Sequence, residues 1–263
     1  MRLPGGLIEG GAVRRQWRFQ PVSGRLELAL AEAAEQVAVV PQAVTLVLAL
    51  ALAELGDSAA TEERTANLCV PDRQFLMREL DRHLGGGTGW FHADCSACAA
   101  RFDFYLDLAD LPVREAGPGY PLARVEHRGQ TLSFRLPTGA DQHELAGAAV
   151  ENGRPWLLRR LSLEPEHLGE IDGTLLDRAD AALEAVAPGV INQVQAECPE
   201  CGAANNVDLD PYRVLARSGD ELLRQVHQIA MHYHWSEAEI LAMPQTRRLR
   251  YLDLIDRARG MGA

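Results

Sequence analysis

Hydrophobic and polar residues alternate near the start of the chain and then change to a helical spacing. From Val13 to residue 22, Val13, Trp17 and Phe19 fall on one side of a two-residue period, with arginine and glutamine on the other. This pattern predicts a half-exposed strand. Ser23 can then cap a helix that runs to about residue 36. Residues 1–11 are rich in glycine, and we expect them to form a flexible lead-in.

The most apolar stretch of the chain is residues 41–55, in which leucines alternate with valine and alanine. The alternation fits a strand, but alanine is poor in strands and good in helices. Pro41 also suits the first turn of a helix. The stretch therefore predicts a helix that is apolar on every face. Such a helix must be buried, and we expect burial within this chain in preference to burial by a partner.

The middle of the chain mixes helical and strand patterns. A helix is predicted to begin at Pro71 and to end at the triple glycine 85–87, which we interpret as a hinge. Further along, strands are predicted at 90–94 and 101–108, a hairpin at 122–127 and 130–136, helices at 139–150, 154–161 and 173–186, and strands at 190–197 and 204–209.

The last part of the chain returns to helical patterns. Ser218-Gly-Asp-Glu221 and Ser236-Glu-Ala-Glu239 both have the Ser-x-x-Glu form of a capping box. They predict helices near 219–234 and 237–242, and Pro244 precedes a last predicted helix near 245–259.

Four of the five cysteines form two Cys-x-x-Cys pairs, Cys95 with Cys98 and Cys198 with Cys201. Together they offer four thiolates at the vertices of a tetrahedron, which is what a structural zinc ion requires. The pairs of a zinc ribbon usually lie ~15–20 residues apart, whereas 99 residues separate Cys98 from Cys198 here.

The long separation does not forbid a shared site. Lengthening the loop from ~20 to ~100 residues costs roughly 1.4 kcal/mol of loop-closure free energy. Binding of zinc contributes roughly 10–16 kcal/mol in small finger peptides. We therefore predict one Zn²⁺ bound by Cys95, Cys98, Cys198 and Cys201. Rubredoxin-like iron binding and two unrelated cysteine pairs are the alternatives. The fifth cysteine, Cys69, is predicted to be a buried thiol.

Charge and composition narrow the classes of function. The formal net charge of −11 argues against general affinity for nucleic acid or for an anionic membrane. All 26 basic residues are arginine, so Schiff-base chemistry and a phosphate-binding P-loop are excluded. No apolar run reaches the ~18–20 residues of a membrane span. Cysteines in metal-like pairs with no signal peptide predict a cytoplasmic protein.

The chain has none of the common catalytic motifs, and a four-cysteine site leaves no coordination position for a substrate. We therefore predict that the protein is not an enzyme. A redox enzyme is a weaker alternative, because it would need an exposed thiol of low pKa in Cys198-Pro-Glu-Cys201. His227, His232 and His234 have no carboxylate at ligand spacing and are interpreted as exposed or capping residues.

Four residues near the C-terminus are of the types that most often anchor protein interfaces: Trp235, Arg247, Arg248 and Tyr251. We predict that they bind a partner, and the alternative is that Trp235 and Tyr251 form the core of a small helical bundle. The arginines also follow two short helices, as in a helix-turn-helix. A zinc-ribbon and helix-turn-helix regulator that binds DNA is therefore the second functional hypothesis.

Five segments between about residue 70 and residue 255 together resemble one family. They are Pro71-Asp-Arg-Gln-Phe-Leu76, Leu136-Pro-Thr-Gly-Ala-Asp141, Cys198-Pro-Glu-Cys201-Gly202, Trp235-Ser-Glu-Ala-Glu-Ile-Leu241 and Arg247-Arg248-x-x-Tyr251-Leu252. The chain resembles the baseplate hub assembly (chaperone) family of contractile phage tails and contractile injection systems. The resemblance implies a non-enzymatic accessory protein that binds baseplate or tail proteins during assembly. It leaves open whether the protein remains in the finished particle.

These patterns predict an α+β fold in three regions. Residues 1–88 form an N-terminal strand and helical region. Residues 89–210 form a split zinc ribbon, with knuckles at 95–98 and 198–201 and an inserted hairpin and helices at about 110–190. Residues 211–263 form a C-terminal helical region.

Overall fold

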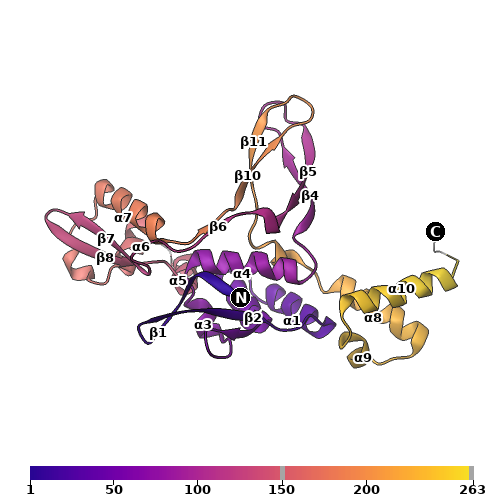
Figure 1. Cartoon of the computed structure of the whole chain (residues 1–263). Helices are drawn as coiled ribbons and strands as arrows, with labels where there is room; N and C mark the ends of the chain where they lie inside the picture. The colour runs from indigo at the N-terminus through magenta and orange to yellow at the C-terminus, as the bar shows by residue number, and fades with distance from the viewer. Residues whose placement is uncertain (149–151, 261–263) are drawn as a thin grey trace.

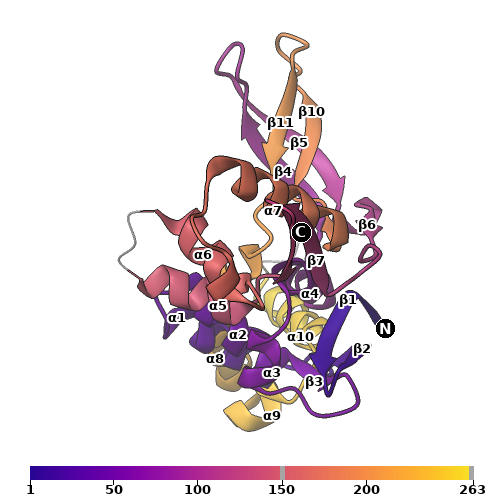
Figure 2. The same cartoon turned by 90° about the vertical axis from the view of Figure 1, so that its left-hand side faces the viewer.

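The computed structural model describes residues 1–148 and 152–260. It is a mixed α+β arrangement of helices and small antiparallel sheets, so the predicted fold class is confirmed at that level. Figures 1 and 2 show a central body from which three parts project: a pair of long hairpins, a third hairpin covered by helices, and a group of C-terminal helices.

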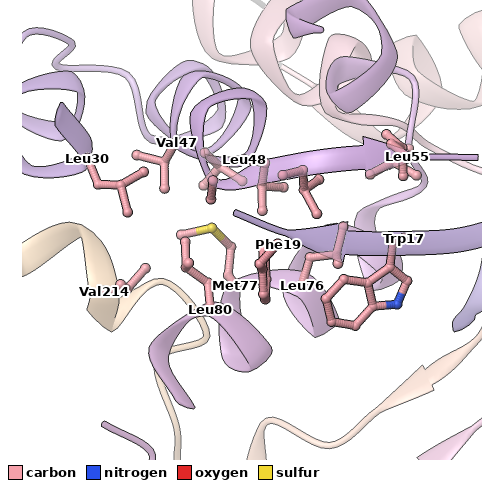
Figure 3. Packing of buried hydrophobic residues seen from close by; sticks show 14 of the residues in the cluster. Trp17, Phe19, Leu30, Val47, Leu48, Leu55, Leu76, Met77, Leu80 and Val214 are labelled. Carbon is pink, nitrogen blue, oxygen red and sulfur yellow. The ribbon is translucent and has the colours of Figure 1, made fainter. Parts of the chain in front are cut away.

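The central body packs a three-stranded antiparallel sheet, in the order β1-β2-β3, against four helices. These elements are β1 (Arg2–Glu9), β2 (Ala12–Phe19), α1 (Gly24–Glu35), α2 (Val40–Ala51), β3 (Leu52–Leu55), α3 (Glu62–Ala66) and α4 (Val70–His83). The core lies between β2, α2 and α4, where Trp17, Leu48 and Met77 are among the buried side chains (Figure 3). Val214, from the short helix η3 (Arg213–Ala216), also reaches this core.

The prediction of a flexible lead-in at residues 1–11 is wrong. Arg2–Glu9 form strand β1, whose central residues are buried. Asp72 of α4 accepts hydrogen bonds from the backbone amides of Gly5 and Gly6 at 2.9 and 2.7 Å. A Cβ atom at Gly5 would lie 2.7 Å from the Asp72 carboxylate. Position 5 therefore needs glycine because the strand passes too close to the buried Asp72 side chain for any larger residue, and not because the segment is loose.

Residues 41–55 form a helix that is followed directly by a strand. The helix prediction is confirmed for α2, which ends at Ala51, and is wrong for Leu52–Leu55, which pair with β2 as strand β3. Val44, Val47 and Leu48 are at most 2% exposed, so the chain itself buries most of this apolar helix as predicted. Within the described residues, no helix combines the length and apolarity needed to cross a membrane.

Residues 108–192, here called the insert, form a unit between the two long hairpins. A short antiparallel pairing of β6 (Val113–Arg114) with β9 (Gly189–Val190) holds its two ends together. Its other elements are η1 (Leu108–Asp110), β7 (Leu122–His127), β8 (Gln130–Arg135), α5 (Gly139–Gly147), α6 (Gly153–Leu161), η2 (Pro165–His167) and α7 (Gly173–Val186). The predicted hairpin and helices are thus present, although residues 149–150 of the predicted helix 139–150 lie outside the described residues.

The insert docks on the central body through two of the segments that carry the family resemblance. The backbone amide of Val70 donates to the carbonyl of Pro137 at 3.0 Å, and the amide of Gly139 donates to the carbonyl of Leu68 at 3.2 Å. Arg73, which is fully buried, lies directly against Gly139. Residues 71–76 and 136–141 are therefore parts of one contact.

The C-terminal lobe, residues 219–260, contains α8 (Asp220–Tyr233), α9 (Glu237–Leu241) and α10 (Gln245–Ala258). The capping box at Ser236 is confirmed, because Ser236 and Glu239 exchange side-chain to backbone hydrogen bonds. The capping box predicted at Ser218 is wrong. Gly219 is the N-cap of α8, and the Ser218 hydroxyl accepts a hydrogen bond from the nearby amide of Asp220.

Candidate metal centre

Two antiparallel hairpins lie side by side and bring the cysteine pairs together (Figures 1 and 2). We call them the double hairpin: β4 (Thr88–Asp94) with β5 (Arg101–Asp107), and β10 (Gln193–Glu197) with β11 (Ala204–Asp208). Phe102 and Ala196 are buried between the hairpins, next to Cys95 and Cys198. Each Cys-x-x-Cys segment forms the turn at the end of its hairpin, so the two turns meet at one tip.

The four sulfur atoms lie within 4.8 Å of one another. The Sγ atoms of Cys95 and Cys201 are 3.6 Å apart, and those of Cys98 and Cys198 are 3.8 Å apart. Four sulfurs placed ~2.3 Å from one tetrahedral ion would be about 3.8 Å from each other. The distances are far longer than the ~2.05 Å bond of a disulfide. The predicted cysteines therefore form a possible metal site.

The two turns have the same backbone geometry. In the first turn, the amide of Cys95 donates to the carbonyl of Ala100, and the amide of Ala99 donates back to the carbonyl of Cys95, both at 2.9 Å. The second turn repeats both bonds at the same lengths, with Gly202 in the place of Ala99. Ala99 and Gly202 have φ values of 59° and 72°. Glycine adopts this left-handed conformation without strain, whereas alanine is strained by roughly 1–2 kcal/mol.

The thiols of Cys95 and Cys201 differ in acidity. Backbone amides of Cys98 and Ala97 donate hydrogen bonds to the Cys95 sulfur and lower the pKa of this thiol to about 6. The amide of Ala203 lowers the pKa of Cys201, but the sulfurs of Cys98 and Cys95 outweigh it and raise the pKa to about 12. Adjacent thiols cannot all ionise without a cation between them. A metal ion must therefore displace protons when it binds, and its affinity should rise with pH.

Asn205 of β11 links the two turns and was not among the predicted site residues. Its side-chain oxygen accepts from the backbone amide and the hydroxyl of Ser96 at 2.9 and 3.0 Å. Its side-chain nitrogen donates to the sulfur of Cys95 at 3.7 Å and to the carbonyl of Ala203 at 2.8 Å. Asn205 is 5% exposed and uses its whole hydrogen-bonding capacity. The one signal in the sequence is its place on the inward side of β11, in alternation with Val207.

Replacing Asn205 by leucine, which has a similar size and no polar atoms, is expected to weaken metal binding about 10- to 100-fold. The reason is that the Ser96 amide loses its partner and the Cys95 sulfur loses one of its donors, while the four ligands stay in place. Competition with a chromophoric chelator measures the change. Asn206→Leu, on the exposed side of the same strand, is the matched control. Equal metal affinity in the two variants would show that Asn205 has no role at the centre.

The prediction that Arg248 binds a partner is wrong, because its side chain is fully buried within the protein. Its guanidinium forms an ion pair with Glu27 of α1 at 2.8 Å and donates to the carbonyl of Met243 at 2.7 Å. It also donates to the side chain of Gln225 at 3.4 Å. Arg248 therefore fastens the C-terminal lobe to the central body.

The other three predicted residues lie together on the C-terminal lobe. Trp235 and Tyr251 are half-buried and pack against the core of the lobe, while Arg247 is exposed. The rings of Trp235 and Tyr251 are perpendicular, with centroids 4.9 Å apart. The guanidinium of Arg247 lies 5.8 Å from the centre of the Tyr251 ring. The pair thus contributes to the core of a small helical bundle, as the alternative predicts, while partner binding by Trp235, Arg247 and Tyr251 stays a prediction.

The remaining candidates do not add a second site. His227, His232 and His234 are exposed, and in residues 1–148 and 152–260 the four cysteines are the only group of three or more potential ligands that comes together. Cys69 is buried, as predicted. Burial and the neighbouring carboxylate of Asp72 raise the pKa of the Cys69 thiol well above its usual value, so this thiol is not activated as a nucleophile.

Comparison with known proteins finds no family model that matches the chain and no significant match among curated proteins or solved structures.

Proposed function

We propose that the double hairpin is a zinc ribbon with structural Zn²⁺, and that the protein is a non-enzymatic accessory factor of a contractile phage tail or contractile injection system. In this role it binds baseplate or tail proteins during assembly. The metal part of the proposal is supported by the four adjacent sulfurs, since four thiolates complete a tetrahedral shell and leave no open position. The assembly part is supported by the resemblance of the five sequence segments.

The observation that carries the binding role is a hollow on the C-terminal lobe. Its volume is about 300 Å³, and its lining residues are Trp235, Glu239, Ala242, Met243, Pro244 and Arg247. Trp235 is held in place by Tyr233, stacked at 4.9 Å, and by Tyr251. A rigid tryptophan beside an exposed arginine loses little entropy on binding and is typical of the anchor of an interface.

A pull-down with the baseplate and tail proteins encoded near this gene tests the proposal. The wild-type protein is expected to capture at least one of them. Arg247→Glu reverses the charge at the rim of the hollow and is expected to weaken capture at least about tenfold. Arg250→Glu is the matched control, because Arg250 lies on the same helix, is exposed, and makes no ion pair with a described residue.

Two results would contradict the proposed role. Equal capture by folded Arg247→Glu and Arg250→Glu proteins would remove the hollow as the binding surface. Retention of a DNA duplex in place of these proteins would favour the regulator. The burial of Arg248 against Glu27 takes one arginine away from any DNA-facing surface of α10.

A further inference from the structure

The double hairpin carries an exposed aromatic pair on the outer face of its first hairpin. Trp90 of β4 and Tyr105 of β5 stand directly opposite each other in the strand register. They are 73% and 59% exposed, and their ring centroids are 5.7 Å apart. Tryptophan is largely buried in most proteins, so an exposed and paired tryptophan indicates a binding surface.

The same double hairpin is strongly acidic. Residues 88–107 and 193–208 contain six carboxylates and one arginine. Within the described part of the chain none of the six forms an ion pair; they are Asp94, Asp103, Asp107, Glu197, Glu200 and Asp208. Elsewhere in the chain many carboxylates, such as Asp81 and Asp141, are paired with arginines. The double hairpin thus keeps a net negative charge that no ion pair with a described residue offsets.

Aromatic rings and carboxylates share one face. Along β5, Asp103 lies two positions before Tyr105, so both side chains are on the same side of the strand and about 7 Å apart. His92 stands opposite Asp103, and two positions nearer the tip Asp94 stands opposite Arg101. A guanidinium over the Trp90 ring would gain a cation–π contact and lie within reach of the Asp103 carboxylate.

We propose that this face, formed by Trp90, Tyr105, Asp103 and Asp94, docks an arginine-rich segment of a partner protein. Complementary charge would steer the segment to the face, and the two rings would anchor its guanidinium groups. The uncompensated carboxylates repel nucleic acid and anionic membranes. The surface is separate from the hollow at Trp235, so the inference goes beyond the proposed assembly role and does not depend on it.

A labelled peptide of alternating arginine and glycine is the probe, with fluorescence anisotropy of the peptide as the measurement on the full-length, metal-loaded protein. The double variant Trp90→Ala/Tyr105→Ala is expected to bind the peptide about tenfold more weakly than wild type. Asp103→Asn is expected to weaken binding and to reduce its dependence on salt. Both rings are exposed, so the double variant should keep its metal content and melting temperature.

Met231→Ala, which removes an exposed apolar side chain from the C-terminal lobe, is the matched control and should bind like wild type. Arg247→Glu should also leave peptide binding unchanged, which separates this surface from the one at Trp235. The inference is overturned if the peptide does not bind, or if it binds the double variant as tightly as wild type. The second result would show only non-specific attraction to acidic residues.

Discussion

Replacing Cys198 by serine is expected to abolish metal binding and to unfold the double hairpin, while the central body keeps its packing. Cys198 is fully buried, and the loss of its thiolate leaves an incomplete tetrahedron. Structural zinc contributes roughly 10–16 kcal/mol in finger peptides, and the few apolar residues between these hairpins cannot replace that contribution. Elemental analysis should show a fall from about one ion per chain to almost none. Hydrogen exchange should show loss of protection in residues 88–107 and 193–208.

Cys69→Ser is the control for this experiment. Cys69 is also buried, but it lies beside Tyr120 and Asp72, away from the other cysteines. Burying a hydroxyl in its place should cost about 1–3 kcal/mol in global stability and leave the metal content unchanged. If both serine variants lose the metal, or neither does, the assignment of Cys198 as a ligand and Cys69 as a structural thiol is incorrect.

Gly139→Ala is expected to destabilise the protein by at least about 3 kcal/mol, a large effect for one added methyl group. The new Cβ atom would lie 2.3 Å from Cζ and Nη1 of Arg73. Arg73 cannot move aside easily, because its guanidinium donates to the Thr45 hydroxyl at 3.0 Å and to the carbonyls of Thr65 and Pro41 at 2.8 and 2.6 Å. Burial lowers the pKa of Arg73 to about 10, so it remains charged at neutral pH. Thermal or urea denaturation measures the loss.

Gly147→Ala is the matched control, since it adds the same methyl group to the same helix. No described atom lies within 4 Å of the Cβ position at Gly147, so the change should be neutral or stabilise the protein by about 0.5–1 kcal/mol. In an Arg73→Met background, Gly139→Ala should cost less than it does in the wild type. Equal costs for Gly139→Ala and Gly147→Ala would show that the contact with Arg73 is not tight.

The four cysteines of the candidate metal site could be predicted from the sequence because each pair is local and both pairs have the same spacing. Each Cys-x-x-Cys pair fits a single turn, and thiolate ligands have few other uses at that spacing. Asn205 could not be predicted in the same way. Its role depends on Ser96 of the other hairpin, and the two are 109 positions apart. Spacing within one segment carries no information about such a contact.

Contacts between separate segments also account for the wrong predictions elsewhere in the fold. Glycine in residues 1–11 suggests a loose segment, but the segment pairs with β2 as a strand and is held against the distant Asp72 at Gly5 and Gly6. Arg248 is of a residue type that often anchors interfaces, whereas Glu27, 221 positions away, pairs with it and makes its burial possible. The alternation of leucine with alanine in residues 41–55 fits both helix and strand, and packing against β2 decides where one changes to the other.

The two halves of the double hairpin are far apart in the sequence. The ribosome therefore makes them at different times, which affects how they fold in the cell. Cys95 and Cys201 are 106 positions apart. At about 5–20 residues per second, the ribosome makes the second cysteine pair some 5–20 s after the first. During this interval Cys95 and Cys98 offer a metal ion only two ligands, so any ion they bind can leave again. The insert is translated in the meantime, and once the pairing of β6 with β9 forms, its ends are already close. The ion can then join the two cysteine pairs before the C-terminal lobe, which is translated later, packs against α1 through Arg248 and Glu27.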